Sequence, residues 1–78
     1  MKNLFNKHSK WKSTLVASDK TIKDAIINLN KSQLKIVLIV DSKTNSFLGI
    51  VSDGDIRRGF LKGFKLNSQI IRVLNKKP

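Results

Sequence analysis

The chain has 78 residues with no cysteine and one histidine, and its 16 lysine and arginine residues against five acidic ones give a formal net charge of +11. This length allows one domain at most, and the composition excludes disulfide bonds and argues against a metal centre, for which His8 would be the only imidazole. No apolar run reaches the roughly 18 to 20 residues that cross a bilayer and no secretory signal is visible, so we expect a soluble, cytoplasmic protein.

The positive charge would suit nucleic acid, an anionic membrane or a phosphorylated ligand. The lysines are scattered along the chain, however, without an arginine-rich stripe or a recognisable nucleic-acid motif. A basic nucleic-acid-binding module is therefore an alternative hypothesis rather than the leading one.

The first part of the chain predicts a short strand followed by a helix. Residues 1–12 are polar and basic and are interpreted as a lead-in, and residues 13–16 predict a short strand. Ser18 or Asp19 can cap a helix that begins near Thr21. The apolar residues of this helix recur at the i, i+3, i+4 and i+7 positions that give one buried face, namely Ile22, Ala25, Ile26 and Leu29.

The middle of the chain predicts a β-hairpin. Residues 35–41 contain five successive apolar residues, which is too few for an independent helix. They are rich in β-branched side chains, so we predict a central strand buried on both faces. Residues 42–46 form a polar turn, and residues 35–51 together make an antiparallel pair.

After Ser52 the apolar spacing becomes helical, and Gly63 is a predicted stop for this helix. A second short helix is expected to start at residues 66–68 and to end at Asn75. The predicted fold is α/β in composition, of the α+β type: a small β-α-β-β-α unit with a three-stranded sheet and helices on one side. So small a unit should leave apolar surface exposed, so we expect it to pair with a second copy.

The junction between the third strand and the following helix contains polar side chains. Ser52 and Asp55 lie in one turn at a helix N-terminus, where unpaired backbone N–H groups attract phosphate. The same Ser-x-x-Asp spacing is also the capping-box pattern, in which the two side chains only satisfy the helix's own donors. Taken alone, these residues favour the capping interpretation.

Three blocks of sequence together resemble a CBS domain, the regulatory motif first described in cystathionine β-synthase. They are Thr21-Ile22-x-x-Ala25, the apolar strand that ends in Asp41, and Gly49 followed by two apolar residues and Ser52-x-x-Asp55. The resemblance covers residues 13–75, and residues 76–78 would begin a linker to a second motif. The fuller string from Ser52 to Gly59 resembles the first CBS motif upstream of bacterial sugar-phosphate nucleotidyltransferases.

The resemblance implies a site for an adenine nucleotide, with AMP, ADP or ATP as a regulatory ligand and no required cofactor. Ser52 and Asp55 would engage the phosphate and the ribose, and Arg58 would hold a phosphate. Leu38 stands where many members of the family have proline, and Asp53 adds a negative charge beside the phosphate position. These departures would lower the affinity for a polyphosphate, favour a nucleoside or a monophosphate, or leave this motif structural while a partner motif binds the ligand. The implied adenine contacts are Val16, Ala17, Ile36 and Val37, and the alternative for these residues is a place in the core.

The leading hypothesis is therefore a regulatory ligand-sensing module. Its nucleotide cleft would be shared with a second CBS motif, from the same longer chain or from a homodimer, and it would control an attached nucleotidyltransferase. No catalytic constellation is visible, so we do not expect the chain alone to be an enzyme. A structural dimerisation module without a ligand is the other alternative.

Overall fold

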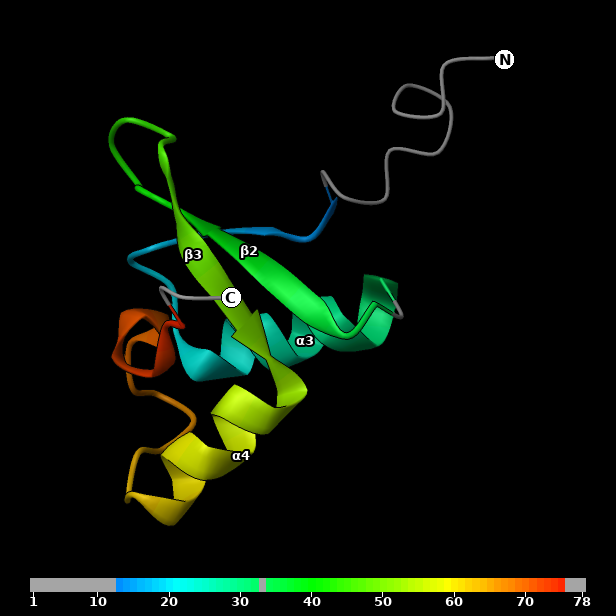
Figure 1. Cartoon of the computed structure of the whole chain (residues 1–78), viewed down its shortest axis with the longest axis vertical. Coiled ribbons are helices and arrows are strands. Elements are labelled where there is room, and N and C mark those ends of the chain that lie inside the picture. The colour runs from blue at the N-terminus through cyan, green and yellow to red at the C-terminus, as the bar shows by residue number, and fades with distance from the viewer. Residues whose placement is uncertain (1–12, 33, 76–78) are drawn as a thin grey trace.

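The structure is a computed structural model that describes residues 13–32 and 34–75, so the predictions for residues 1–12 and 76–78 lie outside the described residues. Figure 1 shows the order of its elements. They are β1 (Leu15–Ala17), α3 (Ile22–Ser32), β2 (Ile36–Val40), β3 (Phe47–Ser52), α4 (Asp53–Leu61) and the 3₁₀ helix η1 (Ile70–Val73).

The three strands form one sheet in the order β1-β2-β3. Strand β1 is parallel to β2, and helix α3 provides the crossover connection that a parallel pair needs. Strand β2 is antiparallel to β3 across the hairpin. The predicted α+β unit and the central place of the second strand are confirmed. The first strand lies slightly later than predicted, at Leu15–Ala17 instead of residues 13–16.

The core lies on one face of the sheet, which we call the inner face. Successive side chains of a strand point to opposite faces, and the buried ones alternate with less buried ones along β2. Helices α3 and α4 both contribute to this core, so the prediction of helices on one side is confirmed. The buried residues are Val16, Val37, Ile39 and Val51 of the sheet, Ile22 and Ala25 of α3, Ile56 of α4 and Ile70 of η1.

The opposite face of the sheet, which we call the outer face, remains partly exposed. The prediction that the central strand is buried on both faces is therefore wrong, because α3 and α4 cover only the inner face. Leu38 is half-buried, and its cross-strand neighbours are Leu15, which is 39% exposed, and Ile50. The outer face consists of Leu15, Ala17, Ile36, Leu38, Val40 and Ile50.

Helix α3 is capped by a different residue from the two predicted. The hydroxyl oxygen of Thr21 accepts a hydrogen bond from the Asp24 N–H at 3.2 Å, and the Asp24 carboxylate accepts one from the Thr21 N–H at 3.0 Å. This reciprocal pair is the capping-box arrangement. Ser18 instead accepts a hydrogen bond from the Ser42 N–H, which joins the β1–α3 connection to the hairpin.

The hairpin turn starts one residue earlier than predicted. Strand β2 ends at Val40, and the Asp41 carboxylate accepts hydrogen bonds from the backbone N–H groups of Lys43 and Thr44 at 2.7 and 3.0 Å. Asn45 adopts a positive φ of 64°, a conformation that asparagine tolerates in turns. Asp41 is therefore a turn residue that organises the connection.

The end of helix α4 confirms the predicted stop at Gly63. This residue has a φ of 102°, and its N–H donates to the Phe60 carbonyl at 3.0 Å. The Phe64 N–H donates to the Gly59 carbonyl at 3.0 Å. The two bonds form the Schellman arrangement that glycine favours after a helix.

The predicted helix starting at residues 66–68 does not form there. The chain is extended or turning until Ile70, where the short helix η1 begins. Beyond η1, Asn75 forms an isolated antiparallel bridge with Ile50, with N–H to carbonyl distances of 2.9 and 3.2 Å. The described C-terminal segment is thereby attached to the free edge of β3. None of the helices in the described residues is long and apolar enough to cross a membrane.

Candidate ligand-binding site

Ser52 ends strand β3 and caps helix α4. Its backbone is extended (φ −102°, ψ 169°), and its hydroxyl oxygen accepts a hydrogen bond from the Asp55 N–H at 3.1 Å. The Asp55 carboxylate accepts hydrogen bonds from the Ser52 N–H at 2.8 Å and from the Ser52 hydroxyl at 2.9 Å. The capping-box interpretation is confirmed, and the two predicted site residues lie in contact.

The second carboxylate oxygen of Asp55 pairs with Arg58. The guanidinium lies 2.6 Å from Oδ1, and the side chain of Asp55 is 10% exposed while that of Arg58 is 64% exposed. Burial raises the pKa of Asp55, but the hydrogen bonds from Ser52 and the bond and charge of Arg58 outweigh it and leave the pKa below its ordinary value. Asp55 is therefore an ionised acceptor at neutral pH.

Asp53 adds a second carboxylate to the first turn of α4. It pairs with Arg57 at 3.2 Å, and both side chains are about 70% exposed to solvent, at 71% and 70%. Such an exposed i, i+4 pair contributes little free energy because water screens it. The negative charge of Asp53 thus remains close to the helix N-terminus.

The structure brings only one of the four predicted adenine contacts to this junction. Ile36 is the cross-strand partner of Ser52. Val16 and Val37 are 7% and 0% exposed and point into the core. Ala17 pairs with Val40, which lies four residues along β2 from Ile36. At roughly 3.3 Å per residue, Ala17 is therefore about 13 Å from the junction.

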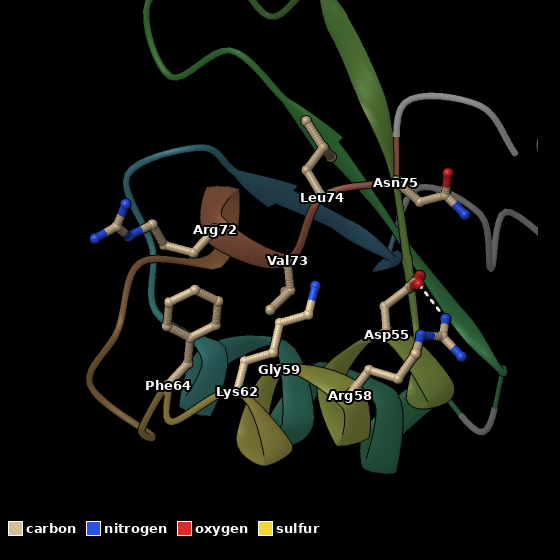
Figure 2. A pocket seen from close by; sticks show the side chains of 9 residues that line it. All are labelled: Asp55, Arg58, Gly59, Lys62, Phe64, Arg72, Val73, Leu74 and Asn75. Atoms are coloured by element: carbon tan, nitrogen blue, oxygen red, sulfur yellow. Dashed lines mark hydrogen bonds and ion pairs between the residues drawn. The ribbon is translucent and has the colours of Figure 1, made fainter.

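A pocket of about 220 Å³ opens between helix α4 and the segment around η1. We call it the α4–η1 pocket (Figure 2). Its α4 wall is one helix face, in which residues three or four positions apart follow one another, and Asp55 connects it to the capping box. The lining residues are Asp55, Arg58, Gly59 and Lys62 of the α4 wall, and Phe64, Arg72, Val73, Leu74 and Asn75 opposite.

Lys62, Arg72 and Asn75 were not predicted as site residues. The i, i+3, i+7 spacing of Asp55, Arg58 and Lys62 could have indicated a shared helix face. Arg72 and Asn75 reach the pocket only because the chain after Gly63 packs back against α4. Gly63 predicts the end of the helix, but no local pattern predicts this packing. No group of three or more histidine, cysteine or acidic residues that could hold a metal ion occurs among residues 13–32 and 34–75.

Three carboxylates that accept backbone hydrogen bonds, two in capping boxes and one in the hairpin turn, predict that the protein loses stability in acid. Hydrogen bonds from the backbone of Thr21 and of Lys43 lower the pKa values of Asp24 and Asp41, and the pKa of Asp55 is also lowered. A carboxyl whose pKa is lower in the folded state stabilises the fold above its unfolded pKa. We therefore expect the free energy of unfolding to fall as the pH drops below the ordinary carboxyl value of 3.8.

Urea titrations monitored by circular dichroism at several pH values between about 2.5 and 6 would measure this dependence. The Asp55→Asn variant should be less stable at pH 6 and should lose less stability on acidification. An unchanged slope in that variant would contradict the assigned role of Asp55.

Comparison with known proteins gives partial sequence matches. No protein-family model matches the chain. Two uncharacterized proteins from different strains of Helicobacter pylori are each 36% identical over 64 residues, which is 82% of this chain and 19% of the relative. The chain therefore spans about one fifth of the length of these curated relatives.

Solved structures give a clear likeness in fold. A CBS domain protein from Pyrobaculum aerophilum in complex with AMP matches with a TM-score of 0.73 and 17% identity over 80% of this chain and 48% of its own. A CBS-domain protein from Agrobacterium tumefaciens has a TM-score of 0.72 and 20% identity over 81% of this chain and 48% of its own. A cystathionine β-synthase domain protein fused to a Zn-ribbon-like domain has a TM-score of 0.71 and 18% identity over 82% of this chain and 91% of its own. At these identities the likeness shows a shared fold.

Proposed function

We propose that this chain, whose fold is that of a single CBS domain, is a regulatory module that binds an adenine nucleotide at the β3–α4 junction. The observation that carries the proposal is the contact between Ser52 and Asp55 beside a cationic pocket. The AMP complex of the Pyrobaculum aerophilum protein supports the choice of ligand. A cytoplasmic location and the absence of a catalytic step in this chain are parts of the same proposal.

The geometry suggests how a nucleotide would be held. Asp55 is ionised and already accepts several hydrogen bonds, so ribose hydroxyls would compete with Arg58 for its Oδ1 atom. Arg58 would then be free to bind a phosphate. Ile36 would offer an apolar wall beside Ser52, whereas Val16 and Val37 would support the site only from within the core.

A second CBS motif would complete the cleft. The chain spans only 48% of the Pyrobaculum aerophilum and Agrobacterium tumefaciens chains, which leaves room in those proteins for a second unit. We infer that residues 13–75 form one motif and that a second motif, from a longer chain or another copy, packs on the outer face. Ala17 would then contribute to this contact rather than to the junction.

Regulation would follow from a change in how the two motifs pack. A ligand can shift such an equilibrium only by its difference in affinity for the two arrangements. We further propose that the regulated enzyme is a nucleotidyltransferase that makes nucleotide-activated sugars. This step rests on the resemblance of the sequence string from Ser52 to Gly59.

Calorimetric titration of AMP, ADP, ATP and GMP at about 0.15 M salt tests the binding proposal. We expect saturable, adenine-selective binding that weakens at least tenfold, or about 1.4 kcal/mol, in the Asp55→Asn variant. Asp53→Asn is the matched control, because it removes the exposed carboxylate of the same turn and should not weaken binding. A folded chain that binds none of these nucleotides would instead favour the structural dimerisation hypothesis.

The net charge of +11 favours one second candidate, a basic nucleic-acid-binding module. This function predicts binding to any polyanion with a steep salt dependence, because phosphate contacts release counterions. It also predicts that Asp55→Asn preserves or strengthens binding. Titration of a single-stranded oligonucleotide at several salt concentrations therefore separates the two functions.

A further inference from the structure

The α4–η1 pocket carries an excess of positive charge. Its lining residues include three cations (Arg58, Lys62 and Arg72) and one carboxylate (Asp55), which give the pocket a net charge of +2. Arg58 is paired with Asp55. Within the part of the chain that the structure describes, neither Lys62 nor Arg72 has a carboxylate partner. The pocket therefore attracts a doubly charged anion more strongly than a neutral or positive ligand.

The walls of the pocket are held close together. A Cβ atom added to Gly59 would lie 2.5 Å from Cγ1 of Val73, so helix α4 and η1 approach each other at a distance that only glycine allows. The backbone bonds between Asn75 and Ile50 fix the far end of the η1 wall. The pocket is thus a consequence of packing between two elements.

The cations occupy different places in this pocket. Figure 2 shows the Lys62 amino group pointing toward Val73 at the centre of the view, with the Asp55–Arg58 pair to one side. The Arg72 guanidinium lies on the opposite side, 5.6 Å from the centroid of the Phe64 ring. Lys62 and Arg58 are therefore placed for direct contact with a bound anion, and Arg72 for longer-range attraction from the rim.

The N-terminus of α4 is a poorer place for a phosphate. The Ser52 hydroxyl and the Asp55 N–H already bond to each other, and the Asp53 carboxylate adds a negative charge. These groups offset the attraction that a helix N-terminus exerts on anions. In the pocket, by contrast, the amino group of Lys62 has no carboxylate partner among the described residues and is available to a phosphate bound beside Asp55.

We propose that the α4–η1 pocket is the phosphate subsite of this module and selects a phosphomonoester. A phosphomonoester carries about −1.5 to −2 charges at pH 7, which matches the charge of the pocket. The volume of about 220 Å³ lies below the roughly 300 to 1,000 Å³ of sites that enclose a drug-sized ligand, so one phosphoryl group fits better than a whole nucleotide. Placement of the nucleoside at Ser52 and Asp55 rests on the proposed function.

Adenosine and AMP, titrated separately at equal ionic strength into the wild-type chain and two variants, test this inference. The variants are Lys62→Gln, inside the pocket, and Lys65→Gln, a matched control outside it. We expect AMP to bind at least tenfold more tightly than adenosine to the wild type and to Lys65→Gln. In Lys62→Gln this advantage should largely disappear while adenosine binding stays unchanged.

The outcomes separate the inference from the proposed function. Equal affinities of AMP and adenosine for the wild type, or equal losses in both variants, would overturn the phosphate subsite and leave nucleoside binding intact. If adenosine fails to bind, the proposed nucleotide site is wrong. Titration with inorganic phosphate, followed by the amide resonances of Gly59 and Gly63, then decides: saturable shifts lost in Lys62→Gln support the subsite, and their absence overturns it.

Discussion

The Gly49→Ala variant is expected to lose about 2 to 4 kcal/mol of stability, because overpacking at this position cannot relax at low cost. An added Cβ would lie 2.7 Å from the backbone oxygen of Asn75 and 2.9 Å from Cδ1 of Leu74. The φ of Gly49 is 159°, which other residues rarely adopt. That Asn75 oxygen accepts the Ile50 N–H, so moving it away breaks the bridge to β3.

Gly63→Ala is the control for this prediction. Gly63 also has a positive φ, of 102°, but no heavy atom lies within 4 Å of its added Cβ. It should therefore show only the conformational penalty of about 1 to 2 kcal/mol. Urea unfolding monitored by circular dichroism compares the variants, and similar losses in both would contradict a steric role for the Asn75 segment.

The local patterns of the sequence predicted most of the fold. The spacing of Ile22, Ala25 and Leu29 identified α3, and the apolar run from Ile36 to Val40 identified the central strand. Both signals follow directly from the periodicity of a helix and a strand. The cap was misplaced because Ser18, Asp19 and Thr21 are all good capping residues, and only the reciprocal bonds with Asp24 select Thr21.

The candidate site was less predictable. Ser52 and Asp55 form a local motif and were found, but the pocket joins Asp55 to Arg72, 17 positions later. Gly63 predicts where α4 ends, but no local pattern predicts that the chain after it packs back against this helix. The implied contacts Val16 and Val37 are core residues because the phase of each strand, and not its composition, decides which side chains face the helices.

The partly exposed outer face leads to the second large expected effect. Leu38 lies in its middle row, between Leu15 and Ile50. If a second copy packs on this face, Leu38→Lys would place an ammonium group in an apolar contact without a partner. We expect wild-type chains to self-associate and the variant to associate at least 100-fold more weakly while remaining folded, because Leu38 is only half-buried in one chain.

Sedimentation equilibrium over a wide concentration range would measure this effect, with Leu61→Lys as the matched control. Leu61 is 83% exposed at the end of α4, which packs on the inner face of the sheet. The same substitution there changes the net charge equally without touching the proposed contact. Weaker association of both variants to the same extent would indicate charge repulsion. A wild-type chain that stays monomeric throughout would contradict pairing between copies, and a second motif in the same longer chain would then be the partner to test on the outer face.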